Sequence, residues 1–156
     1  MINLRAFMRI GFTGTRFGMT IEQEQCIINA VASVKSEGNL GHGLKRLEFH
    51  HGVCVGSDEK FHKIVVKAGF GDNIIKHPPI NDYLMSKTCI EGIFLEPKPF
   101  LERDDDVIKA VEIMLATPHE EYEIMRSGTW ATIRHARKKK KPIFIIFPNG
   151  EVSIQS

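Results

Sequence analysis

The sequence predicts an α/β fold, a three-layer arrangement in which a mostly parallel sheet of about five strands carries helices on both faces. One observation behind this prediction is that short apolar runs alternate along the chain with stretches of helical periodicity. Another is that three of the apolar runs end in turns rich in Gly, Thr and Ser, each followed by a helical pattern. Strands that alternate with helices favour parallel pairing, because a parallel connection needs a crossover.

Each expected strand is a short apolar run bounded by turn residues. The expected strands cover residues 7–12, 44–49, 73–76, 111–116 and 142–147, with a short tail strand at 151–154 after the turn at 148–150. Residues 80–99 are less regular, and Pro97 and Pro99 indicate a loop there.

The expected helices cover residues 20–36, 58–68, 99–109 and 127–139. Thr20 is a suitable N-cap for the first helix, with Glu22 and Gln23 in its first turn, and the glycine-rich segment 38–43 ends it. Asp58 is expected to cap the second helix, which Gly69 ends.

Length and composition indicate one globular domain over residues 1–156, with 42% hydrophobic and 26% charged residues. The 21 basic and 19 acidic residues nearly balance, which disfavours a nucleic-acid or membrane protein. The basic stretch 134–141 is interpreted as the solvated end of a helix, with a nucleic-acid patch as the alternative.

The three cysteines are widely and irregularly spaced, so they predict neither a disulfide framework nor a CxxC metal pair. The sequence contains no apolar stretch of about 20 residues and no signal-peptide pattern at its start. We therefore expect a soluble, cytoplasmic protein that needs no cofactor.

The segment 126–132 opens the last long helix and predicts an anion site. The first turn of a helix leaves backbone N–H groups without partners and carries partial positive charge. Gly128 would let a phosphate approach these groups, Ser127 and Thr129 add hydroxyl donors, and Arg126 adds a guanidinium. An ordinary Ser N-cap is the alternative interpretation.

Two further turns follow apolar runs and strengthen the prediction. One contains Gly14, Thr15 and Arg16, and the other contains Gly52 and Gly56. If the strands are parallel, all three turns lie on the carboxyl edge of the sheet, where such sheets bind ligands.

Several residues in these regions allow other interpretations. Possible metal ligands are dense in the second turn, but their spacing matches no established zinc pattern, and the glycines suit a phosphate turn better; the residues are His50, His51, Cys54, Asp58 and His62. No metal is therefore expected. Trp130 could stack on a base or belong to the core, and Tyr83 and Phe100 are alternative stacking partners.

Three motifs together resemble the SLOG superfamily. They read Gly11-Phe12-Thr13-Gly14-Thr15-Arg16, then His51-Gly52-x-Cys54-x-Gly56-x-Asp58-Glu59-x-x-His62, then Arg126-Ser127-Gly128-Thr129-Trp130-Ala131-Thr132. This Rossmann-like group includes the LOG-type cytokinin-activating phosphoribohydrolases, the DNA-processing protein DprA and sensors of nucleotide-derived signals. The resemblance covers nearly the whole chain and is strongest toward small SLOG proteins of phages and prophages.

The resemblance to the LOG enzymes fails at two positions. Those enzymes carry an Arg-Lys pair and a Gly-Thr-x-x-Glu segment, in which the Arg and the Glu serve catalysis. Here Arg103 matches the Arg, Asp104 stands in place of the Lys, and Thr132 stands in place of the Glu. A hydroxyl cannot replace a carboxylate as a base or stabilise an oxocarbenium-like centre. The carboxylates that could substitute are Asp58, Glu59 and Glu123.

We therefore expect a protein that binds a nucleotide or a nucleotide-derived signalling molecule, such as an ADP-ribose derivative or a cyclic nucleotide. If it derives from a phage, the resemblance implies a sponge that sequesters an immune signal. The expected ligand-binding residues are Gly14, Thr15, Arg16, Gly52, Gly56, Asp58, Arg103, Arg126, Ser127, Gly128 and Thr129.

The sequence is also compatible with two other functions. One is an N-glycosidic nucleotide hydrolase or transferase that uses Asp58, Glu59 and Arg103. The other is DprA-like nucleic-acid binding through the basic stretch. We also expect a homo-oligomer, a dimer or higher.

Overall fold

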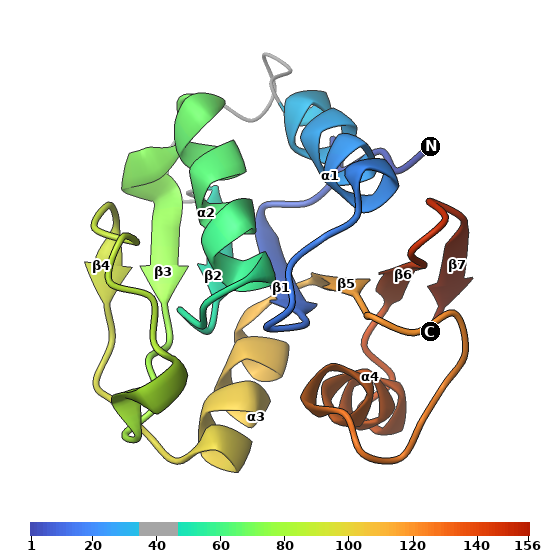
Figure 1. The fold of residues 1–156 in the computed structure, drawn as a ribbon. Coiled ribbons are helices and arrows are strands. Elements are labelled where there is room, and N and C mark those ends of the chain that lie inside the picture. The colour runs from blue at the N-terminus through green and yellow to red at the C-terminus, as the bar shows by residue number, and fades with distance from the viewer. Residues whose placement is uncertain (35–46) are drawn as a thin grey trace.

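The computed structural model describes residues 1–34 and 47–156, which form a seven-stranded sheet with helices on both faces (Figure 1). The strands are β1 (Arg9–Gly14), β2 (Glu48–His51), β3 (Ile74–Lys76), β4 (Ile93–Phe94), β5 (Ile113–Thr117), β6 (Ile143–Ile146) and β7 (Val152–Gln155). The helices are α1 (Ile21–Ser33), α2 (Ser57–Lys67), α3 (Phe100–Ala110) and α4 (Gly128–Lys138), with short 3₁₀ helices η2 (Gly71–Asn73) and η3 (Asp82–Leu84).

The strand order is β4-β3-β2-β1-β5-β6-β7, and every neighbouring pair is parallel except β6 and β7. From β1 the chain adds β2, β3 and β4 on one side, then crosses to the other side of β1 to add β5 and β6. The direction of strand addition therefore reverses between β1 and β5. In open α/β sheets, ligands bind at the carboxyl ends of the strands beside such a reversal.

The two faces of the sheet are covered by different helix pairs. One core contains Ile10 and Phe12 of β1 together with apolar side chains of α1 and α2. The other core contains Met114 and Ala116 of β5 together with apolar side chains of α3 and α4. Successive strand residues point to opposite faces, so the same strands supply both cores. This is the Rossmann-like, three-layer arrangement that the sequence predicts.

One local prediction is confirmed and two are corrected. Thr20 is the N-cap of α1 and forms a full capping box with Gln23. Asp58 is not the cap of α2, because the helix begins one residue earlier and its N-cap is Gly56, at φ 85°. The sheet has seven strands rather than about five among the described residues, since β4 and the expected tail strand both pair.

Strand β4 lies within the segment that was expected to be irregular. It has only two residues, Ile93 and Phe94, and both are exposed, so no alternation of buried and exposed positions marked it in the sequence. The expected helix break at 38–43 lies outside the described residues. Among the helices that the structure describes, none is both long enough and apolar enough to cross a bilayer.

Trp130 belongs to the core and is not available to stack on a base. Its side chain is 2% exposed and packs against the Phe147 ring at a centroid distance of 6.2 Å. Its indole N–H donates to Glu120 Oε1 at 3.1 Å, which satisfies the one polar atom of the ring. The first turn of α4 is thus fixed by a buried aromatic side chain.

Replacing Trp130 by Ala should lower the free energy of unfolding by about 3–5 kcal/mol, because a large cavity would remain beneath α4. Tyr122→Ala is the matched control: Tyr122 is 71% exposed and should change stability by only about 0.5 kcal/mol. Urea denaturation followed by far-ultraviolet circular dichroism measures both. A loss below about 1 kcal/mol for Trp130→Ala would contradict the core assignment.

Candidate functional site

A cleft of about 430 Å³ lies at the carboxyl ends of β1 and β5, where the direction of strand addition reverses. The structure therefore brings the three predicted turns to one edge of the sheet. Ten of the eleven residues that were expected to bind ligand line this cleft: Gly14, Thr15, Arg16, Gly52, Asp58, Arg103, Arg126, Ser127, Gly128 and Thr129.

The amino terminus of α4 forms one wall of the cleft. Ser127 is the N-cap, and its hydroxyl accepts a hydrogen bond from the Trp130 N–H at 3.2 Å. The backbone N–H groups of Gly128 and Thr129 have no partner among the described residues. A Cβ at Gly128 would meet no atom within 4 Å, so this position faces open space. Two free donors and the positive end of the helix therefore face the cleft.

The turn after β1 forms the opposite wall. Arg16 is exposed and makes no ion pair within the described residues, and its guanidinium lies 5.2 Å from the centroid of the Phe17 ring. Phe17 is 67% exposed and lies 5.0 Å from the His119 ring. The sequence gives no sign of this exposed ring, because a lone Phe in a turn carries no pattern that separates an exposed ring from a buried one.

Arg126 extends the wall formed by α4. Its side chain is exposed and, like that of Arg16, has no ion-pair or hydrogen-bond partner in residues 1–34 and 47–156. The cleft thus has an uncommitted cation on each side. An uncommitted guanidinium can donate two parallel hydrogen bonds to a phosphate.

Arg103 lies at the floor of the cleft and is only 6% exposed. Its Nη1 donates to the carbonyl of Gly52 at 2.7 Å, and its Nε lies 3.0 Å from Asp104 Oδ1 without hydrogen-bond geometry. A Cβ at Gly52 would collide with the guanidinium, so glycine is what permits this approach. Arg103 is therefore already committed to the protein, unlike Arg16 and Arg126.

Asp58 is the most perturbed acid of the cleft. It is 5% exposed, and its Oδ2 accepts a hydrogen bond from the Cys54 N–H at 3.1 Å. Burial raises the pKa of Asp58 to about 6, although the positive charge of Arg103 acts in the opposite direction. Burial also raises the pKa of the Cys54 thiol to about 11, which leaves it protonated and unreactive at neutral pH.

Asp104 supplies a second carboxyl group of the cleft, which lies beside Thr132. The hydroxyl of Thr132 lies 3.2 Å from Asp104 Oδ2 and 3.0 Å from the Gly128 carbonyl. Burial raises the pKa of Asp104, and Arg103 opposes that shift. No pattern in the sequence places Asp104 beside Thr132, because the two residues are 28 positions apart and only the fold brings them together.

Three residues that the sequence predicted to take part in ligand binding or catalysis, one glycine and two glutamates, lie outside this cleft. Gly56 packs against the Arg16 backbone, which a Cβ would overlap. Glu59 accepts a hydrogen bond from the Ser86 hydroxyl, which lowers the pKa of Glu59. Glu123 pairs with two arginines of α4, at 3.3 Å to Arg134 and 2.6 Å to Arg137.

The basic stretch at the end of α4 is partly engaged by these contacts. Besides the two arginines held by Glu123, Lys141 donates to the Val111 carbonyl. Fewer basic side chains of this stretch are therefore free to bind the phosphate backbone of a nucleic acid than the sequence suggests.

On comparison with known proteins, no protein-family model matches this chain, and no curated protein matches it. The arrangement itself is chemically specific. Two uncommitted cations and two free N–H groups surround the mouth of the cleft, and a buried carboxyl group, Asp58, and a partly exposed one, Asp104, flank a buried guanidinium at its floor. Such a site can hold an anionic ligand at the mouth and accept hydrogen bonds from ligand hydroxyls at the floor.

The raised pKa of Asp58 predicts a pH-dependent gain in stability for Asp58→Asn. Between its usual value of 3.8 and about 6, the folded protein keeps a proton that the unfolded chain has lost. The stability that this group adds is complete below about pH 4 and lost as pH rises through about 6. Relative to the parent, Asp58→Asn should therefore gain up to roughly 3 kcal/mol between pH 4 and pH 7.

Urea denaturation of both proteins at several pH values measures this difference and cancels the contributions of other titrating groups. A difference between the two proteins that is the same at both ends of the range would show that Asp58 titrates as an ordinary surface acid.

Proposed function

We propose that the cleft binds a nucleotide or a nucleotide-derived signalling molecule, such as an ADP-ribose derivative or a cyclic nucleotide. The observation that carries the proposal is the pair of uncommitted arginines, Arg16 and Arg126, beside the free N–H groups of Gly128 and Thr129. Exposed cations without ion-pair partners attract anions, and a helix amino terminus is suited to phosphate.

The rest of the cleft suits the other parts of a nucleotide. The buried carboxyl group of Asp58 and the partly exposed one of Asp104 can accept hydrogen bonds from ribose hydroxyls. Phe17 and Phe100 line the same cleft and are 67% and 40% exposed, so their rings are available to an aromatic base. The positive charges at the mouth of the cleft suit the phosphate, and the carboxyl groups at its floor suit the ribose.

The resemblance to the SLOG superfamily supports the same function, and the fold agrees with a Rossmann-like group. A Thr at the position of the LOG catalytic Glu favours binding without cleavage. Within this proposal, the specific biological role is that of a phage sponge that sequesters an immune signal. Retention of intact ligand is the property that defines such a role.

Gly128→Val should weaken binding of ADP-ribose or AMP by well over tenfold, because a branched side chain would stand where the phosphate meets the free N–H groups. Gly128→Ala should cause a smaller loss. Gly71→Ala is the control, since Gly71 lies outside the cleft and a Cβ there would make only ordinary contacts, the shortest at 3.5 Å.

Isothermal titration calorimetry with a panel of nucleotides measures these affinities. The open space at Gly128 should let both variants fold, which circular dichroism checks. A folded Gly128→Val protein that binds as tightly as its parent would place the site elsewhere.

An N-glycosidic hydrolase or transferase is the second candidate, and Asp58 favours it. A buried carboxyl with a pKa of about 6, in a cleft beside a guanidinium, is suited to general acid–base catalysis near neutral pH. The structure adds Asp104 to the available carboxyl groups.

Incubation with a nucleotide panel separates binding from cleavage. We expect the parent protein to return the ligand intact after denaturation, with no free base in the chromatogram. Release of base that Asp58→Asn abolishes, and that Glu59→Gln leaves unchanged, would replace the binding proposal with the hydrolase.

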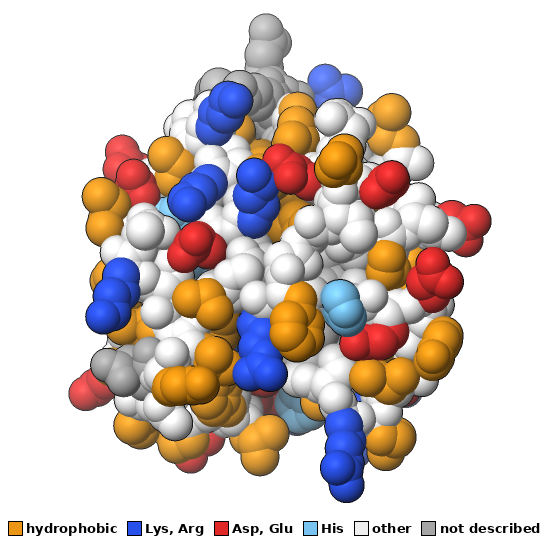
Figure 2. Space-filling model, viewed as in Figure 1, with side chains coloured by type: hydrophobic (Ala, Val, Ile, Leu, Met, Phe, Trp, Pro, Cys, Tyr) orange, Lys and Arg blue, Asp and Glu red, His pale blue; other side chains and the backbone are white. Residues whose placement is uncertain are grey.

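The homo-oligomer expected from the sequence remains part of the proposal. Hydrophobic side chains gather at the lower left of the molecule, over η3 and the start of α3 (Figure 2), and further exposed ones lie on the nearby strand β4. They are exposed, and they include Ile80, Tyr83, Ile93, Phe94 and Leu101. An apolar surface of this kind beside an edge strand supports association with a second copy.

A further inference from the structure

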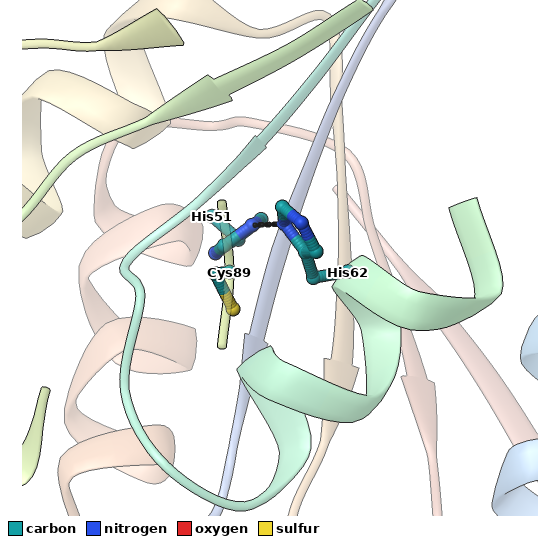
Figure 3. A group of neighbouring side chains, drawn as sticks. All are labelled: His51, His62 and Cys89. Carbon is teal, nitrogen blue, oxygen red and sulfur yellow. Dashed lines mark hydrogen bonds between the residues drawn. The ribbon is translucent and has the colours of Figure 1, made fainter. Parts of the chain in front are cut away.

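Three buried side chains outside the nucleotide cleft converge from separate parts of the chain (Figure 3). His51 ends β2, His62 lies on α2, and Cys89 precedes β4. Their exposed fractions are 0%, 1% and 2%. One nitrogen of each ring and the sulfur all lie within 4.8 Å of one another.

We propose that His51, His62 and Cys89 bind one zinc ion. Zinc binds nitrogen at about 2.0–2.1 Å and sulfur at about 2.3 Å, so the ligand atoms of a tetrahedral site lie roughly 3.4–3.6 Å apart. His51 Nε2 and His62 Nδ1 are now 2.9 Å apart. The two nitrogens must therefore separate by about half an ångström, and the Cys89 sulfur, within 4.8 Å of both, must come to about 3.6 Å from each.

The ligand types select the metal. Two imidazole nitrogens and a thiolate suit zinc and related d-block ions, whereas magnesium and calcium prefer oxygen. The described residues add no fourth His, Cys or carboxylate to the group, which leaves the fourth coordination position to water. The proposal is independent of the nucleotide cleft.

Glu91 orients one of the ligands. His62 Nε2 donates to Glu91 Oε1 at 2.8 Å, which turns the lone pair of His62 Nδ1 toward the cluster. A carboxylate behind a ligating histidine is the usual second partner in zinc sites. Because Glu91 is partly exposed, it can be replaced without opening the core.

The hydrogen bonds place each proton of the metal-free cluster. The Val53 N–H donates to His51 Nδ1 at 3.0 Å, so the neutral His51 ring carries its proton on Nε2. That proton lies between the two ligand nitrogens, since His51 Nε2 donates to His62 Nδ1. It occupies the position that the ion would take.

Coordination must therefore move two protons. The His51 proton passes to Nδ1, which ends the hydrogen bond from Val53, and the Cys89 thiol releases its proton to solvent. The Val53 N–H and the His51 Nδ1–H are then two donors that face each other, so zinc binding must shift the turn at Val53, whose φ of 62° is a left-handed conformation that β-branched residues rarely adopt.

The charges around the cluster also accommodate a divalent ion. The buried Lys76 ammonium donates to the Cys89 carbonyl at 2.8 Å and adds one positive charge. A Cys89 thiolate and the carboxylates of Glu59 and Glu91 add three negative charges nearby. The three positive charges of the zinc ion and the ammonium then equal the three negative charges of the thiolate and the two carboxylates.

Titration of metal-free protein with Zn²⁺ and Co²⁺ tests the proposal. We expect one equivalent of Zn²⁺ per chain, a higher melting temperature, and a sulfur-to-cobalt charge-transfer absorption with Co²⁺. Cys89→Ser should remove this absorption, and Glu91→Gln should weaken zinc binding by about 10–100-fold.

Two variants serve as matched controls. Cys26→Ser removes a thiol that lies outside the cluster, and His77→Gln disrupts the other buried histidine pair, in which His50 and His77 lie 2.7 Å apart. Both should bind zinc as the parent does. X-ray absorption at the zinc edge of the parent protein, which needs no variant, should show one sulfur ligand.

The absence of stoichiometric zinc binding would overturn the proposal. A zinc shell without sulfur, or a cobalt absorption that survives in Cys89→Ser and disappears in Cys26→Ser, would overturn it as well.

Discussion

The parallel pairing of β1 with both of its neighbours is the constraint on which the candidate site depends. Gly11 aligns with His50 of β2 on one side and with Met114 of β5 on the other. Because all three strands run in the same direction, the turns that follow them meet at one edge of the sheet. A shift in either register would separate the walls of the cleft, and the same free arginines would then face solvent alone.

The second constraint is electrostatic and lies at the floor of the cleft. Arg103 is buried beside Asp58 and Asp104, and its guanidinium also holds the Gly52 carbonyl. A buried charge is tolerated only when it is paired, so these groups depend on one another. The uncommitted cations are at the mouth instead, where water can solvate them until an anion binds. This division separates groups that maintain the fold from groups that remain available to a ligand.

The features that could be predicted from the sequence are those determined by interactions between residues close in the chain. Thr20 and Gln23 form their capping box within one helical turn, and the apolar runs marked the central strands. The grouping of Arg16 with Gly128 was also predictable, because parallel strands fix which turns share an edge.

Other features depend on contacts between distant residues and could not be predicted in this way. Asp104 lies beside Thr132, and Cys89 lies beside His51 and His62, through packing that no local pattern encodes. Strand β4 forms because β3 offers it an edge, although its own two residues have little strand signal. Propensity is a weak guide where tertiary contacts decide the outcome.

In the binding mode that we propose, phosphate lies between the α4 amino terminus and the turn after β1. The most direct measurement is the change in backbone amide chemical shifts of ¹⁵N-labelled protein when ADP-ribose is added. The largest changes should occur at Gly128 and Thr129, whose N–H groups have no partner in the described residues, and at Gly14 to Arg16 across the cleft. Saturating ADP-ribose that leaves these amides unmoved, or that moves only amides outside the cleft, would contradict the account.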